Sequence, residues 1–83
     1  MSVVIETPAF RLEVSYQLCS LKSNTIDKYA PFAPNDFEGF LSAAAWVGIR
    51  QGTETFDSLV LKAIEAGAVR IEDYLKFANR PTV

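Results

Sequence analysis

The stretch FRLEVSYQL, residues 10–18, alternates strictly between apolar and polar side chains. Its apolar members all fall at even positions: Phe10, Leu12, Val14, Tyr16 and Leu18. A period of two residues is typical of a half-buried β-strand, because successive side chains of a strand point to opposite faces. Thr7 followed by Pro8 resembles a helix N-cap, so a helix over residues 8–22 is the alternative. On a helical wheel the apolar residues scatter around the axis, and we therefore predict a strand.

A second, shorter strand is predicted at residues 3–5, where three apolar β-branched residues follow one another. It would pair either within the chain or with another copy, and the two strands make up a β element over residues 3–18. Two strands alone are marginally stable in water. This element therefore needs helices packed on it or a second subunit that extends it.

A loop is predicted over residues 19–35, because Asn24, Pro31 and Pro34 interrupt every periodic pattern there. One helical turn around residues 25–29 would place an isoleucine and a tyrosine, Ile26 and Tyr29, on the core.

The stretch EGFLSAAAWVGIRQG, residues 38–52, belongs to a helix predicted over about residues 36–51. Asn35 is its expected N-cap and Gly52 its expected end. One face carries an amphipathic stripe: Phe37, Phe40, Leu41, Ala44 and Val47. The opposite face is not polar, since it contains Gly39, Ser42, Trp46 and Ile49. We therefore expect this helix to lie between two layers; the alternative is that Trp46 and Ile49 form a dimer interface.

Two more helices are predicted, over residues 54–66 and 70–79. Thr53 or Thr55 caps the first and Gly67 ends it, and Pro81 follows the second. The expected apolar stripe of the last helix comprises Ile71, Tyr74, Leu75 and Ala78. The predicted fold is thus α+β, a short N-terminal strand or hairpin element followed by three helices, in one small domain over residues 1–83.

Catalytic signatures are missing from the 83 residues. The chain has no histidine, one cysteine (Cys19) and no glycine-rich phosphate loop. The acidic pairs Asp36/Glu38 and Glu72/Asp73 fall in predicted first turns of helices, where carboxylates stabilise the helix dipole. We therefore expect no enzymatic activity, no cofactor and no metal.

The charges argue against a nucleic-acid ligand. Eight Lys and Arg against ten Asp and Glu give a net charge of −2, and the basic residues are scattered singly. The last two predicted helices, separated by a turn at Gly67, fit the order of a helix-turn-helix. However, Glu72 and Asp73 open the second of them, and only Arg70, Lys76 and Arg80 oppose their charge. A DNA-binding regulator is kept as the alternative function.

Membrane insertion is not expected, because the apolar run is closed by Asp36 and Glu38 on one side and by Arg50 and Gln51 on the other. It is shorter than the about 20 residues that a spanning helix needs. The N-terminus has no basic leader or apolar signal segment, and a lone cysteine cannot form an internal disulfide. A reducing, cytoplasmic setting is expected.

Protein binding is the function that the sequence favours. Leu61 points away from the apolar stripe of its helix, and Phe77 flanks the last helix beside Tyr74 and Arg70. Tyr and Arg are enriched at interface hot spots, so these four residues form the predicted interface. We expect a small adaptor, assembly factor or inhibitor that docks on a larger protein. A structural subunit of a homo-oligomer is the further alternative.

Overall fold

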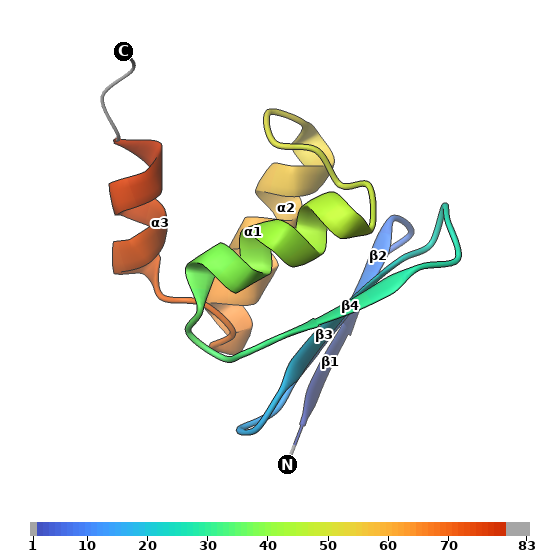
Figure 1. Ribbon diagram of the computed structural model, residues 1–83, viewed down its shortest axis with the longest axis horizontal. Helices are drawn as coiled ribbons and strands as arrows, with labels where there is room; N and C mark the ends of the chain where they lie inside the picture. Colours follow the sequence, from blue (N-terminus) through green and yellow to red (C-terminus); the bar gives the residue numbers. More distant parts are fainter. Residues whose placement is uncertain (1, 80–83) are drawn as a thin grey trace.

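Four antiparallel strands form one sheet, the first two helices cover one of its faces, and the third helix lies to the side of these two (Figure 1). The computed structural model describes residues 2–79, so the predictions at Arg80 and Pro81 lie outside the described residues. The elements are β1 Val3–Glu6, β2 Phe10–Val14, β3 Cys19–Ser23, β4 Tyr29–Phe32, α1 Phe37–Trp46, α2 Glu54–Ala66 and α3 Ile71–Ala78. The strands follow each other in the order β1-β2-β3-β4. The predicted α+β class is confirmed.

The register of the sheet separates a buried face from a solvated one. Leu12 lies opposite Leu21, and Leu21 lies opposite Ala30, so these side chains share the face beneath the helices. Arg11 lies opposite Lys22 on the other face. A slip of one residue would exchange the two faces, so burial of Leu12 and Leu21, each fully buried, specifies this pairing.

The prediction of a loop over residues 19–35 is wrong, because β3 and β4 lie within it. Cys19, Leu21 and Ser23 are buried while the residues between them are not, which is the alternation of a half-buried strand. In β4 the alternation of exposed and buried residues is only four residues long. It contains Pro31, a residue that argues against a strand in a sequence. Proline is tolerated there because β4 is an edge strand.

Residues 24–27 between β3 and β4 form bends without the predicted helical turn. Ile26 and Tyr29 are exposed, so neither side chain is held in the core as predicted. Tyr29 is exposed because side chains alternate between the two faces of β4, and Ala30 and Phe32 occupy the inward positions.

The predicted strand over residues 10–18 is shorter than its alternating pattern. It ends at Val14, and Tyr16 and Leu18 are exposed in the turn that leads to β3. The alternation of apolar and polar residues continues beyond the part of the sheet that the helices cover, so the apolar residues of its last part are not buried.

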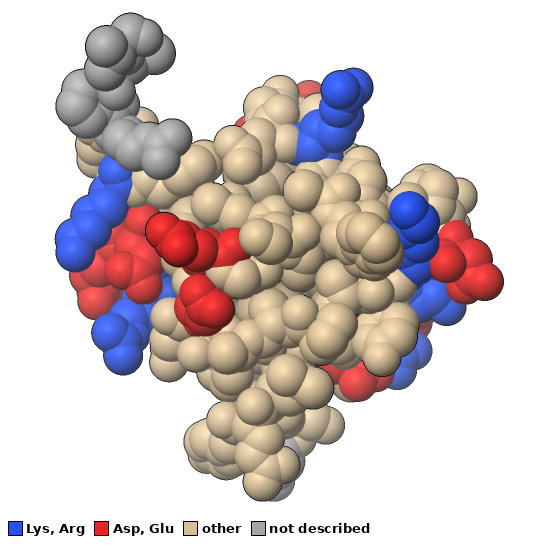
Figure 2. Space-filling model, viewed as in Figure 1, with Lys and Arg blue, Asp and Glu red and all other residues tan. Residues whose placement is uncertain are grey.

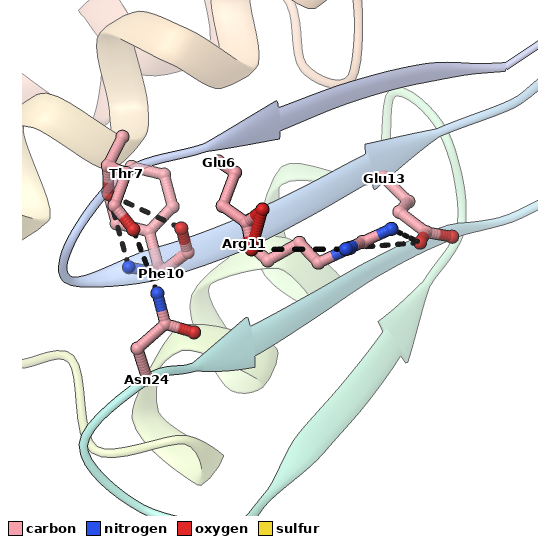
Figure 3. A network of polar contacts seen from close by, with 6 residues as sticks. All are labelled: Glu6, Thr7, Phe10, Arg11, Glu13 and Asn24. Atoms are coloured by element: carbon pink, nitrogen blue, oxygen red, sulfur yellow. Dashed lines mark hydrogen bonds and ion pairs between the residues drawn. The ribbon is translucent and has the colours of Figure 1, made fainter.

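Thr7 closes the turn between β1 and β2 (Figure 3). Its Oγ1 accepts hydrogen bonds from the backbone N–H groups of Ala9 (3.2 Å) and Phe10 (3.1 Å). Asn24 Nδ2 donates to the Thr7 carbonyl at 2.8 Å, which ties the β1–β2 and β3–β4 turns together. The helix-like Thr-Pro pair therefore caps a hairpin turn.

Helix α1 begins one residue later and ends earlier than predicted. Asp36, not Asn35, is its N-cap and accepts from the Gly39 N–H at 3.0 Å; a Cβ at residue 39 would lie 2.6 Å from Asp36 Oδ2. Asn35 instead makes the sharp turn out of β4, with φ of 62°. The helix ends at Trp46 because Gly48 takes a left-handed φ of 83°, so Gly52 is not its end.

Helix α1 packs along β4 and α2 packs over β2. Phe40 of α1 is fully buried; its ring centroid lies 5.5 Å from that of Phe32 and 6.5 Å from that of Phe56. The predicted second layer over Trp46 is wrong, since that side chain is 61% exposed. Ile49 is buried, because the chain leaves the helix at Val47 and turns back to the core.

Helix α2 is capped at both ends by local signals. The Thr53 Oγ1 accepts from the Phe56 N–H, and Gly67 ends the helix in the left-handed conformation. Helix α3 differs from prediction, because Ile71, Leu75 and Ala78 of its expected stripe are exposed. It contacts the core through Tyr74, which belongs to the predicted stripe, and through Phe77, which does not; both are half-buried.

Replacing Phe40 by Ala should lower the free energy of unfolding by about 3–5 kcal/mol, because the cavity opens between β4, α1 and α2. Trp46→Ala should cost about 1 kcal/mol or less in the monomer, since the exposed indole loses mainly its contact with Lys28, whose Nζ lies 4.7 Å from the ring centroid. Urea unfolding measured at low protein concentration checks both values. Equal losses in the two variants would contradict this packing.

Candidate protein-binding surfaces

The four residues of the predicted interface are only partly brought together. Tyr74 and Phe77 both pack on Phe37, with ring centroids 6.4 and 5.4 Å away, and this contact holds α3 against the start of α1. Leu61 is 61% exposed on the outer side of α2, and Arg70 is exposed at the N-cap of α3. Tyr74 and Phe77 therefore attach α3 to the core as well as facing solvent.

A hollow of about 410 Å³ lies between the start of α1 and α3. Its apolar lining consists of Phe37, Leu41 and Phe77, and its charged side chains are Asp36, Glu38, Asp73 and Lys76. With three acidic groups against one basic group, this hollow carries a net negative charge. Desolvating it would be costly for a protein partner.

The turn between β2 and β3 presents Tyr16 on a well-braced support. The Ser15 N–H donates to the Leu18 carbonyl at 3.2 Å, and the Ser15 hydroxyl donates to the same carbonyl at 2.6 Å. The Leu18 N–H in turn donates to the Ser15 hydroxyl at 3.1 Å. Tyr16, at the tip, is 90% exposed.

An uncharged surface surrounds this tip, and we call it the hairpin end. Its exposed apolar side chains include Val3 (48%) and Leu18 (53%) beside Tyr16. A hollow of about 450 Å³ adjoins them, lined by Val3, Val14, Ser15, Tyr16, Pro34, Asn35, Ala66 and Gly67. This end of the sheet projects from the body and shows no charged side chain in Figure 2.

A groove of about 570 Å³ runs between β4 and α1, and we call it the β4–α1 groove. It is lined by Tyr29, Ala30, Pro31, Phe32, Asp36, Gly39, Ser42, Ala43 and Trp46. Two exposed aromatic side chains, Tyr29 (64%) and Trp46 (61%), stand at one end of it. The face that carries α1 is uncharged across its middle, with acidic side chains by the start of α1 and basic side chains near its end, where further acidic ones stand beside them (Figure 2).

The outer face of the sheet carries mutually compensated charges. Arg11 Nη2 lies 3.1 Å from Glu13 Oε1, and Arg11 Nη1 lies 3.9 Å from Glu6 Oε2 (Figure 3). These side chains are roughly half exposed, so the ion pairs contribute little to stability. They keep this face hydrated, as expected for the free face of an antiparallel sheet.

Cys19 lies in the core under the helices and is fully buried. Burial raises the pKa of its thiol above the ordinary value, and a backbone hydrogen bond from Ser15 opposes part of this rise. A neutral, inaccessible thiol is a poor nucleophile. Among residues 2–79, no three His, Cys, Asp or Glu side chains are grouped so that they could hold a metal ion.

In comparisons with known proteins, no family model, no curated protein and no solved structure matches the chain. None of the helices between residues 2 and 79 combines the length and the apolar content needed to cross a bilayer.

Sequence reasoning missed both exposed tyrosines, Tyr16 and Tyr29, as surface residues. Tyr16 has the parity of the buried face, and the turn that exposes it contains no glycine, proline or asparagine. Recognising that the chain turns between Val14 and Cys19 would have required knowing that β3 pairs with β2.

The Cys19 thiol should not react with a disulfide reagent in the native protein, because the reagent cannot reach it. It should react fully in denaturant. An exposed thiol introduced by Gln17→Cys provides the control, since it should react at once in the native protein. Rapid native reaction of wild-type Cys19 would contradict its burial.

The raised pKa of Cys19 also predicts a pH dependence. An unfolded thiol ionises near 9.0, whereas the folded one stays protonated to higher pH. The stabilisation is therefore fully present below pH 9 and is lost as pH rises through the folded pKa. The free energy of unfolding should fall more steeply above pH 9 in wild type than in Cys19→Ala. Parallel curves for the two proteins would contradict the shift.

Proposed function

We propose that this protein is a non-enzymatic binding module that docks on a larger protein through its hairpin end. It would act in the cytoplasm as a small adaptor, assembly factor or inhibitor, without a cofactor or a nucleic-acid ligand. The observation that carries the proposal is the 90% exposure of Tyr16 on a turn braced by three hydrogen bonds.

An exposed tyrosine on a rigid turn is well suited to binding. Tyrosine offers a large contact area with few rotatable bonds, and the Ser15–Leu18 hydrogen bonds already fix the backbone that carries it. Little conformational freedom would be lost when a partner encloses the ring. Tyrosine is for this reason among the residues enriched at hot spots.

The surroundings of Tyr16 support the same role. Val3, Leu18 and the adjoining hollow are uncharged, so a partner would not have to desolvate an ionised group there. Apolar residues around a hot spot exclude water from it and strengthen its contacts. The charged hollow at α3 and the ion-paired outer face of the sheet lack this property.

The chemistry of the described residues supports a role without catalysis. Cys19 is buried, and its raised pKa keeps it protonated. Asp36 is engaged as the N-cap of α1, and Glu72 and Asp73 lie in the first turn of α3. These carboxylates have structural reasons for their positions.

The helix-turn-helix alternative has less support. A recognition helix inserts its first residues into the major groove, and α3 begins with Ile71, Glu72 and Asp73. The two carboxylates would be repelled by the DNA backbone. Tyr74 and Phe77 of the same helix are engaged with Phe37.

Tyr16→Ala should weaken binding of the native partner at least about tenfold, as truncation of a hot spot does. Its melting curve should stay unchanged, because the side chain makes few contacts within the chain. The partner is first identified by affinity capture from the native cell with mass spectrometry, and its affinity is then measured by calorimetry.

The control is Gln17→Ala, an exposed neighbour in the same turn, which should bind like wild type. Leu61→Lys tests the α2 surface in the same assay and should also bind like wild type. Undiminished binding by Tyr16→Ala together with loss in Leu61→Lys would move the interface to α2 and refute the proposal.

A further inference from the structure

The open edge of β4 has a definite set of hydrogen-bonding groups. The Ser23 N–H donates to the Lys28 carbonyl at 3.4 Å, so the backbone groups of Lys28, and by alternation those of Ala30 and Phe32, face β3. Those of Tyr29 and Pro31 face outward. Because proline lacks an N–H, the edge offers one donor, on Tyr29, and the carbonyls of Tyr29 and Pro31.

Beside this edge, α1 presents a narrow seam of mostly small residues. Gly39, Ser42 and Trp46 have the i, i+3, i+7 spacing of one helix face, and Ser42 and Trp46 are exposed there, while Ala43 beside them is buried in the core. Small side chains at the centre let another helix approach closely.

The two ends of the β4–α1 groove carry opposite charges. Lys28 stands over Trp46 at the end of α1, and Asp36 lies at its start. Helix α1 runs antiparallel to β4, since its end lies by the start of that strand.

We propose that a second copy of this chain fills the β4–α1 groove. The two β4 strands pair antiparallel about a two-fold axis, and the two α1 helices pack seam to seam on the same face. Two four-stranded sheets then join into one of eight strands. This interface is separate from the hairpin end and leaves both hairpin ends exposed, so the dimer would present two copies of the docking surface.

Charge complementarity favours this occupant over an unrelated peptide. A two-fold rotation places Lys28 of each copy beside Asp36 of the other. The dimer therefore contains two copies of this pair of opposite charges. An isologous interface requires a surface that is complementary to itself, and this groove meets the requirement.

The strand edge fits the same arrangement. When the strands are centred on Ala30, the Tyr29 N–H of each copy meets the Pro31 carbonyl of the other, and the missing N–H of Pro31 is not used. Only two such hydrogen bonds form, so the seam of α1, which includes Trp46, contributes most of the affinity.

Sedimentation velocity from micromolar to millimolar concentration tests the proposal, and wild type should change from monomer to dimer. Ser42→Arg should raise the dissociation constant at least about tenfold, because it buries two unpaired charges in the seam. Ser42 is exposed in the monomer, so the fold should persist by circular dichroism. Gln51→Arg, an exposed change of the same charge outside the groove, is the control and should dimerise like wild type.

A double-mutant cycle tests the orientation. Lys28→Gln removes one charge, and Asp36→Asn removes the other while keeping a good N-cap. Each should weaken the dimer about twofold to thirtyfold, since the pair occurs twice. In the double variant, the dissociation constant of the dimer should rise by less than the product of the two single-variant factors.

A monomeric wild type throughout the concentration range would overturn the proposal, as would a dimer that Ser42→Arg leaves intact. Full additivity in the cycle would overturn the antiparallel arrangement. If Ser42→Arg does not fold, Trp46→Ala replaces it and should weaken the dimer at least about tenfold.

Discussion

The burial of Phe40 is the constraint on which the rest of the structure depends. This one side chain packs against Phe32 of β4, Phe56 of α2 and Phe37 of its own helix. Phe37 in turn packs against Phe77 of α3. A chain of 83 residues has little apolar area to bury. Joining the sheet to the helices through one aromatic cluster is an economical solution, because aromatic rings bury a large area each.

The position of Phe40 decides which surfaces remain open. Because α1 is held against β4 by its buried side, its flank with Gly39, Ser42 and Trp46 lies in the β4–α1 groove, where Ser42 and Trp46 are exposed. The helices also end short of the β2–β3 turn, so Tyr16 and Leu18 project beyond their cover. The hairpin end and the β4–α1 groove therefore both follow from where the core is placed.

The charged surfaces have a different physical character. Arg11 is paired with Glu13 on the outer face of the sheet, and acidic groups predominate in the hollow between α1 and α3. Hydrated charges of this kind maintain solubility and disfavour docking, whereas uncharged surfaces favour it. The molecule thus separates surfaces that stay in water from surfaces that can be covered.

Local signals in the sequence determined the α+β class, the caps of α2 and the strand at Phe10–Val14. Each depends on neighbouring residues alone. Thr53 accepts a hydrogen bond from a backbone N–H at the start of α2, and Gly67 ends that helix. The alternation of apolar and polar residues identifies the buried face of β2. Tertiary structure decided the rest. It formed β3 and β4 within an expected loop, exposed Tyr16 and Trp46, and buried Ile49. It also left Ile71 and Leu75 of α3 exposed, so that this helix contacts the core through Tyr74 and Phe77. Periodicity tells which side chains share a face, but only the packing of other elements determines whether that face is covered.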